Sequence, residues 1–133
     1  MLTGACFCGT VRYEGGTPLY PPTLCHCESC RRIAGAHAVG WVTCATESFR
    51  FTLGSPKEFH SSQPVTRTFC SNCGTPLTYR HKDRPLEVDI TLTSLDDAKA
   101  HAPIDHIYMN DALPWDEPGD GKPCHPNTRP TGF

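Results

Sequence analysis

Residues 70–74 read Cys-Ser-Asn-Cys-Gly, and this stretch is the clearest structural signal in the chain. Tetrahedral zinc with bonds of about 2.3 Å holds two sulfurs roughly 3.8 Å apart, and a two-residue spacer in a tight turn gives that distance. The glycine after the second cysteine permits a positive φ, which lets backbone amides turn towards the sulfurs. A redox pair would favour a following helix, whereas Gly74-Thr75-Pro76 favours a turn into a strand. We therefore interpret Cys70 and Cys73 as half of a zinc site.

A second cysteine pair, Cys6 and Cys8, lies near the start of the chain. On a regular strand, side chains two residues apart share a face but are about 6.5–7 Å apart, too far for ideal tetrahedral ligation. The segment is therefore expected to bulge or bend, and the flanking Gly4 and Gly9 make this easy. The alternative is two small buried apolar residues, which the presence of a partner pair at 70–73 makes the weaker interpretation.

The third motif, residues 25–30, offers the thiolates of Cys25, Cys27 and Cys30 within six residues. Three protein ligands with an open position are typical of a catalytic zinc site, and four are typical of a structural one. The pairs at 6–8 and 70–73 would then make a closed site, and the third motif an open one. Spacing alone leaves two other divisions open: Cys25 and Cys27 with the 70–73 pair, or His26 or Cys124 completing the third motif.

Composition limits the classes of protein that this chain can belong to. It has 133 residues, 9 Cys, 13 Pro, 11 Gly and a formal net charge of −2. The length fits a single domain, and the near-neutral charge argues against a nucleic-acid partner. No apolar run is long enough for a membrane span, and the N-terminus lacks the features of a signal peptide. We expect a cytoplasmic protein whose reduced cysteines hold metal and compensate for a modest core.

The hydrophobic pattern predicts a mainly β fold with little helix. Strands are expected where apolar or β-branched residues alternate or run together between turn-forming residues. They are residues 10–14, 38–44, 49–53, 65–69, 76–79, 86–92 and 104–109. A two-turn helix is expected over residues 28–34, ended by Gly35, and a shorter helical turn over 95–100. The last twenty residues are rich in Pro, Gly and Asp and are expected to wrap the surface or fray.

In their order along the chain, the three motifs resemble the glutathione-dependent formaldehyde-activating enzyme-like (GFA) family, which includes the domain of centromere protein V. The matching segments are Gly4-x-Cys6-x-Cys8-Gly9-x-Val11, Cys25-His26-Cys27-x-x-Cys30-Arg31 and Phe69-Cys70-x-x-Cys73-Gly74. Further matches are Gly35, Trp41, Arg67, Thr93-x-Leu95-Asp96, His106-Ile107 and Trp115. The resemblance covers roughly residues 3–115 of a single GFA-like domain, and leaves residues 116–133 as a C-terminal tail.

The resemblance implies an Mss4-like, zinc-stapled fold of twisted antiparallel sheets. It assigns Cys6, Cys8, Cys70 and Cys73 to a structural zinc, and Cys25, Cys27 and Cys30 to a catalytic zinc of labile occupancy. The implied reaction joins glutathione to formaldehyde, giving S-hydroxymethylglutathione, and is classed with the carbon–sulfur lyases. A small-molecule thiol and a small aldehyde would be the partners.

Cationic residues are expected near such a site because glutathione carries two carboxylates. Arg31 and Arg67 are the candidates for binding it, although Arg31 could instead offset the negative zinc–thiolate centre. With three cysteine thiolates, bound zinc has a net charge of −1, which weakens its Lewis acidity. A substrate thiol is therefore the more natural fourth ligand. Arg32 is expected to be a solvated helix residue.

Two other functions compete with this interpretation. A non-catalytic, zinc-binding interaction module of Mss4-like fold would have closed metal sites and no pocket beside Cys30. A thiol redox sensor would use the third motif. Other notable side chains are expected to have structural roles. These are packing or hydrogen bonding for His26 and His106, a buried thiol for Cys44, an exposed tail for Cys124, surface positions for His37, His60, His81 and His101, and turns for Asp89 and Asp96. Core positions are expected for Trp41, Phe49, Phe51 and Phe69, with a place in the active-site wall as the alternative for Trp41.

Overall fold

The computed structural model describes residues 1–130 of the chain. Within them the strands are β1 (Leu2–Ala5), β2 (Arg12–Gly15), β3 (Thr23–Cys25), β4 (Val39–Ala45), β5 (Arg50–Leu53), β6 (Lys57–Ser62), β7 (Val65–Phe69), β8 (Pro76–His81), β9 (Glu87–Thr91) and β10 (His106–Ile107). The α-helix is α1 (Glu28–Ala34), and the 3₁₀ turns are η1 (Thr46–Ser48), η2 (Leu92–Ser94), η3 (Ala98–Ala100) and η4 (Met109–Asp111). The fold is mainly β, as predicted.

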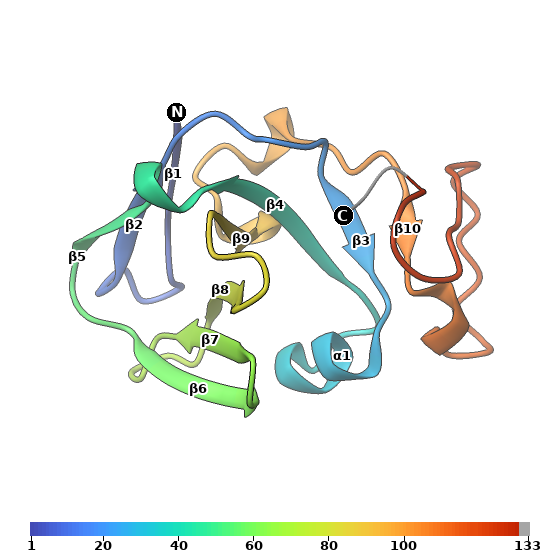
Figure 1. The fold of residues 1–133 in the computed structure, drawn as a ribbon, viewed down its shortest axis with the longest axis horizontal. Helices are drawn as coiled ribbons and strands as arrows, with labels where there is room; N and C mark the ends of the chain where they lie inside the picture. The colour runs from blue at the N-terminus through green and yellow to red at the C-terminus, as the bar shows by residue number, and fades with distance from the viewer. Residues whose placement is uncertain (131–133) are drawn as a thin grey trace.

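The strands form two sheets, which Figure 1 shows with α1 and the C-terminal tail at their edge. The smaller sheet has the order β1-β2-β5, and the larger has the order β10-β3-β4-β9-β8-β7-β6. Neighbouring strands are antiparallel except β10 and β3, which run parallel. This arrangement agrees with the antiparallel sheets that were expected, and the cysteine clusters described below are compatible with zinc stapling.

The main core lies where side chains of both sheets meet. Tyr13 and Phe49 stack with ring centroids 5.6 Å apart, and they pack in one cluster with the buried Cys44, Leu77 and Ile90. Cys6 and Cys70 belong to the same cluster, so the cysteines join the apolar core directly. A second, smaller cluster contains Cys25, Cys30, Trp41 and Ile107. The 6–8 and 70–73 motifs therefore adjoin one part of the core, and the 25–30 motif adjoins the other.

Most predicted strands occur, with ends shifted by one or two residues. The strand over 65–69 has the expected bounds, and α1 covers the expected residues 28–34. The strand predicted over 104–109 is wrong in length, because only His106–Ile107 pair with β3 and Tyr108 then adopts a left-handed backbone with φ 56°. Of the helical turn predicted over residues 95–100, the structure forms the second half, as η3 (Ala98–Ala100). None of the described helices is long and apolar enough to cross a bilayer.

The C-terminal tail runs beside β10 and wraps the surface as expected. The N–H of His106 donates to Pro123 at 2.9 Å, and the N–H of His125 donates back to His106 at 2.8 Å. Further along, Arg129 is buried and contacts both carboxylate oxygens of Asp105 at 2.6 and 2.9 Å. Cys124 is exposed, as predicted. The final part of the expected tail, residues 131–133, lies outside the described residues.

Candidate metal centres and active-site cavity

The first cysteine cluster unites the two motifs that are far apart in the sequence. The four sulfurs of Cys6, Cys8, Cys70 and Cys73 all lie within 4.8 Å of one another. The Sγ atoms of Cys6 and Cys8 are 3.6 Å apart, and those of Cys8 and Cys70 are 3.7 Å apart. These separations are close to the roughly 3.8 Å between sulfurs on tetrahedral zinc. The expected bend in the 6–8 segment is present, because the two cysteines lie in the turn after β1.

Both halves of this cluster are tight turns of similar construction. Gly9 has φ 79° and Gly74 has φ 85°, a left-handed backbone that side-chain-bearing residues rarely adopt. The N–H of Gly9 donates to the carbonyl of Cys6 at 3.1 Å, and that of Gly74 donates to the carbonyl of Cys70 at 2.8 Å. The glycines therefore let the chain reverse around the first cysteine of each pair.

Threonine hydroxyls lie beside the two outer sulfurs. Thr10 Oγ1 is 3.1 Å from Cys8 Sγ, and hydrogen bonding there lowers the pKa of Cys8 to about 7. Thr75 Oγ1 is 3.2 Å from Cys73 Sγ and lowers the pKa of Cys73 to about 5. Burial raises the pKa of Cys6. The outer sulfurs therefore ionise most readily, and thiolates are the form that binds metal.

The second cluster is formed locally at the junction of β3 and α1. The sulfurs of Cys25, Cys27 and Cys30 lie within 4.8 Å of one another. Cys27 is the N-cap residue of α1, and its Sγ accepts the N–H of Cys30 at 3.3 Å. Gly35, with φ 62°, ends the helix about two turns later, as the sequence predicts. The short helix thus turns the third sulfur back towards the first two.

In this cluster, Cys27 is the cysteine that ionises most readily. Hydrogen bonds from Cys25 and then Cys30 lower the pKa of Cys27 to about 2, and the positive charge of Arg67 acts in the same direction. The pKa of Cys25 is correspondingly raised, because its proton is shared with Cys27. Within residues 1–130 no fourth Cys, His, Asp or Glu ligand atom joins these three sulfurs. The structure therefore shows neither of the two alternative divisions of the cysteines.

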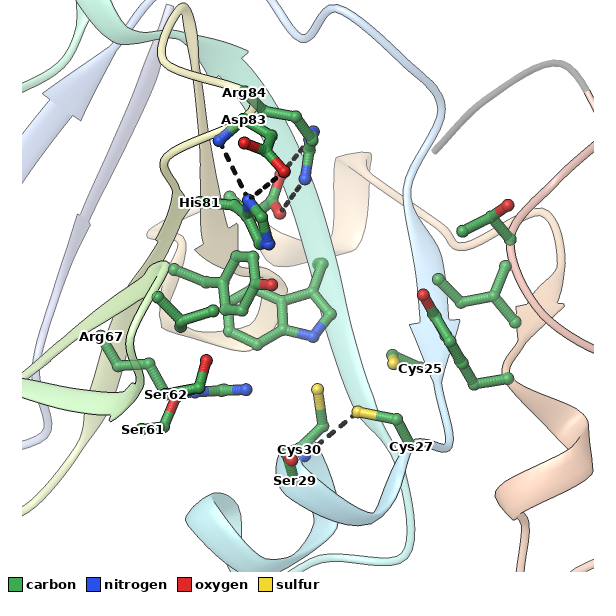
Figure 2. A pocket seen from close by; sticks show the side chains of 17 residues that line it. Cys25, Cys27, Ser29, Cys30, Ser61, Ser62, Arg67, His81, Asp83 and Arg84 are labelled. Carbon is green, nitrogen blue, oxygen red and sulfur yellow. Dashed lines mark hydrogen bonds and ion pairs between the residues drawn. The ribbon is translucent and has the colours of Figure 1, made fainter.

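The three-cysteine cluster opens into a cavity of about 590 Å³, within the range of small-molecule sites. Figure 2 shows the cysteines on one side of this space, Arg67, Ser61 and Ser62 on another, and His81, Asp83 and Arg84 above. The residues that complete its wall are Ser29, Trp41, Val65, Tyr79, Asp89, Ile107, Tyr108 and Thr128. A pocket therefore lies beside Cys30, which an interaction module with closed metal sites was not expected to have.

Arg67 is the cationic residue of the cavity wall that is best placed to bind a ligand. Its side chain is buried, its Nε donates to Ser61 Oγ at 3.0 Å, and its guanidinium lies 4.9 Å from the ring centre of Tyr79. Its Nη1 is buried and has no hydrogen-bond partner. In Figure 2 the guanidinium extends from β7 towards Cys30. Because buried donors are almost always paired, this one is a natural contact for a bound anion.

Arg31, the other predicted glutathione contact, does not line this cavity. Its Nε donates to the carbonyl of His26 at 3.4 Å, and its Nη2 donates to the carbonyl of Asp111 at 3.3 Å. Arg31 therefore fastens the start of α1 to η4. Arg32 is exposed and lies 3.4 Å from Glu28, as expected of a solvated helix residue.

A buried pair of histidines connects the three-cysteine segment to β10. Nε2 of the buried His26 lies 2.9 Å from Nδ1 of His106, and Nε2 of His106 lies 2.8 Å from Asp120. The other ring nitrogen of His26 lies 3.4 Å from Asp116. The predicted hydrogen-bonding roles of both histidines are confirmed: they bond to each other, and His106 also bonds to Asp120 of the C-terminal tail. His37, exposed as predicted, also contacts Asp116, at 2.6 Å.

Sequence reasoning missed the polar side chains on the far side of the cavity. Asp89 is not in a turn: it is buried in β9, where Thr43 Oγ1 donates to it at 2.6 Å and Arg84 pairs with it at 3.2 Å. Burial raises the pKa of Asp89. His81 is half-buried and lines the cavity, so its predicted surface position is wrong. The one available signal was an acidic residue in the middle of an apolar strand.

Comparisons with known proteins support a family assignment. The family model described as glutathione-dependent formaldehyde-activating enzyme matches residues 1–111. A crystal structure of a Rhodobacter sphaeroides protein, a structural genomics target, matches with a TM-score of 0.62 and 22% sequence identity, covering 71% of this chain and 88% of that one. No curated protein matches the sequence. The chain belongs to the glutathione-dependent formaldehyde-activating enzyme (GFA) family.

Proposed function

We propose that this protein is a zinc-dependent enzyme of the carbon–sulfur lyase type that joins glutathione to a small aldehyde. With formaldehyde the product is S-hydroxymethylglutathione. The observation that carries the proposal is the three-cysteine cluster facing a cavity beside the buried, unpaired Nη1 of Arg67. All nine cysteines are free thiols, which fits work in a reducing compartment such as the cytoplasm.

The donor set fits zinc in both clusters. The closed cluster offers four sulfurs, as structural zinc sites do, and we assign it that role. Cys25, Cys27 and Cys30 would hold the second ion and leave one position for a substrate sulfur. When bound there, zinc supplies positive charge that keeps the thiol of glutathione ionised; a free thiol of pKa near 8.5 is only about 3% thiolate at pH 7, so the gain is at most roughly 30-fold.

Arg67 is the residue we assign to a carboxylate of glutathione. Its Nη1 is the part of the guanidinium left without a partner, while Ser61 and the Tyr79 ring fix the rest of the side chain. An ionic hydrogen bond from a preordered, buried arginine contributes about 1.5–3 kcal/mol. This contact would orient glutathione so that its sulfur reaches the side of the cavity where Cys30 lies.

The reaction itself needs one proton and no oxidant. The sulfur attacks the aldehyde carbon, a carbon–sulfur bond forms, and the carbonyl electron pair moves to oxygen, which takes a proton. Tyr108 lines the cavity, and burial followed by the negative charge of the cysteines raises the pKa of its phenol. The phenol therefore stays protonated at neutral pH, and we assign it as a hydrogen-bond donor to the aldehyde oxygen.

An Arg67→Gln variant tests the proposal, with Arg32→Gln as the matched control on the exposed face of α1. We expect the KM for glutathione to rise about 10- to 100-fold in the first variant, from loss of the ionic hydrogen bond, and to stay unchanged in the second. Turnover can be followed as NMR exchange between glutathione, formaldehyde and their adduct. An unchanged KM in Arg67→Gln would contradict the assigned contact.

A Cys27→Ser variant tests the metal assignment separately. We expect it to lose turnover and one of two zinc ions per chain. If it keeps both the metal and the turnover, the three-cysteine site is not the catalytic centre. A wild-type protein with two zinc ions and no turnover would instead favour the interaction module.

A further inference from the structure

A second cavity adjoins the first at the three-cysteine cluster. Its volume is about 270 Å³, and it shares Cys30, Trp41 and Arg67 with the larger cavity. Cys30 therefore faces both spaces, and a group bound to the cysteine cluster can extend into either. The two spaces differ in chemistry, since the larger one has several charged side chains and the smaller one has only Arg67.

The smaller cavity has a largely apolar wall. Its apolar side chains include Ile33, Val39, Phe59, Phe69 and Pro76. The hydroxyls of its two threonines, Thr68 and Thr78, are 2.5 Å apart and hydrogen bond to each other. Each hydroxyl therefore has a hydrogen-bond partner within the wall. Such a wall offers a bound molecule hydrophobic contact and few hydrogen bonds.

Two of these residues also form an apolar entrance. Ile33 of α1 is 39% exposed and Phe59 of β6 is 50% exposed. Formaldehyde has no carbon substituent that could use this surface. A cavity of about 150 Å³ lined by apolar side chains holds a benzene molecule, so about 270 Å³ accommodates a longer or bulkier hydrocarbon group.

We propose that this second cavity binds the hydrocarbon substituent of the aldehyde, and that the preferred substrates are aldehydes with an alkyl or aryl group of about six to eight carbons. The inference rests on the proposed function and deepens it. Glutathione would occupy the larger cavity, the new carbon–sulfur bond would lie near Cys30, and the substituent would pass Trp41 into the apolar space. The product is the hemithioacetal, with the former carbonyl oxygen protonated.

Binding of two stable thioethers tests this without turnover. S-hexylglutathione and S-methylglutathione differ by five methylenes, and each buried methylene strengthens binding about fourfold. If three of the five are buried, S-hexylglutathione should bind about 60-fold more tightly. A Trp115→Phe background leaves Trp41 as the single tryptophan, so its fluorescence reports on the shared wall of the two cavities. Equal affinities would overturn the proposal.

A variant that fills the second cavity tests whether the hexyl group binds there. Ala34→Phe adds a ring in the wall of the second cavity, and Ala36→Phe makes the same change at an exposed position outside it. We expect the preference for S-hexylglutathione to fall below about fivefold in Ala34→Phe and to stay near 60-fold in Ala36→Phe. A preference that survives in Ala34→Phe would contradict the assigned location.

Turnover distinguishes this inference from the function on which it rests. Heptanal, whose substituent is a hexyl chain, should have a kcat/KM at least tenfold above that of formaldehyde in the wild type, and this ratio should fall in Ala34→Phe. Turnover of formaldehyde without any preference for heptanal would overturn the second-cavity assignment alone. Tight binding of S-hexylglutathione without turnover of either aldehyde would overturn the enzyme assignment and leave the binding site standing.

Discussion

The two cysteine clusters use the same ligand atom but connect the chain in different ways. The four-cysteine cluster joins Cys8 to Cys70 across 62 positions of sequence, whereas the three-cysteine cluster lies within residues 25–30. The first ties together the turn after β1 of the smaller sheet and the turn between β7 and β8 of the larger sheet. The second is completed by one capped turn of helix. A metal in the first therefore constrains the whole fold, and a metal in the second constrains little beyond its own segment.

The residues that surround the two clusters also differ. Backbone turns and threonine hydroxyls surround the outer sulfurs of the four-cysteine cluster. The three-cysteine cluster instead faces a cavity that contains a buried arginine without a full set of partners. These surroundings fit the proposed division, in which the four-cysteine cluster would serve stability and the three-cysteine cluster chemistry.

The largest expected difference is in folding. Cys73→Ala should give unfolded or insoluble protein, because structural zinc contributes about 10–16 kcal/mol and the net stability of a domain is only about 5–15 kcal/mol. Cys27→Ala should remain folded. Circular dichroism and solubility measure both outcomes. Equal loss of folding in the two variants would remove the distinction between a structural and a catalytic cluster.

The three-cysteine side of the molecule should also depend on the C-terminal tail. Arg129→Met removes the ion pair between Arg129 and the buried carboxylate of Asp105, and should cost about 3–5 kcal/mol of unfolding free energy at pH 7. Among the described residues, the carboxylate then keeps only Thr23 at 2.7 Å and His125 at 3.2 Å. Urea denaturation measures this cost. A loss under about 1 kcal/mol would show that the tail does not stabilise β10 through this pair.

The same variant has a defined pH dependence. Burial alone would raise the pKa of Asp105, but hydrogen bonds from Arg129 and Thr23 outweigh it, so the pKa lies below its usual value. Its contribution is therefore complete above the unfolded pKa of about 3.9 and is lost as the pH falls through the folded pKa. Without Arg129, burial raises the pKa of Asp105 in the folded variant. The gap between wild type and Arg129→Met should therefore begin to narrow above about pH 4, as the variant's Asp105 takes up a proton, and should narrow further as the pH falls through the lower folded pKa of the wild type. A gap that stays constant down to about pH 4 would point to another group.

Removal of metal from the folded protein should distinguish the two clusters. A chelator present in limiting amount should first remove one zinc per chain without changing the circular dichroism, because three sulfurs bind more weakly than four. We expect a gap in affinity of at least 10- to 100-fold, the loss that follows removal of even an outer hydrogen-bond partner of a metal ligand. Glutathione should slow this first release by supplying a sulfur. Simultaneous release with unfolding would mean that both sites are structural.

The smallest expected effects come from the turn glycines. Gly74→Ala and Gly35→Ala each force a side chain into a left-handed backbone, at a cost of about 1–2 kcal/mol, and neither new Cβ meets another atom within 4 Å. Thermal unfolding should therefore show similar losses. Zinc affinity of the four-cysteine cluster should fall in Gly74→Ala alone, since Gly35 caps α1 outside that cluster.

The sequence was most informative where structure is local. The α1 helix has its predicted ends because Glu28 opens it and Gly35 supplies the left-handed cap. The β6 strand was not predicted, because Lys57–Ser62 is exposed along its length and has no alternating apolar pattern. The β1 and β3 strands were not predicted either, because Leu2–Ala5 and Thr23–Cys25 offer too few apolar or β-branched residues in alternation.

The candidate site was predictable only in part for the same reason. Three cysteines within six residues are visible in any sequence. Arg67 was proposed from its place before the 70–73 pair, but the choice between it and Arg31 required the cavity. The opposite wall comes from β8, β9 and the turn between them, and antiparallel pairing places Tyr79 beside Asp89. That register depends on contacts distant in sequence, which composition and spacing do not encode.

The separation of the four-cysteine cluster along the chain also sets the order in which the sites can form during synthesis. The three-cysteine segment is complete at residue 30, while the other cluster needs residue 73. At about 5–20 residues per second, the ribosome takes roughly 2–9 s to add the residues between them. The local site can therefore take up metal while the long-range loop is still open. The nascent chain thus completes the ligand set of the three-cysteine cluster before that of the four-cysteine cluster.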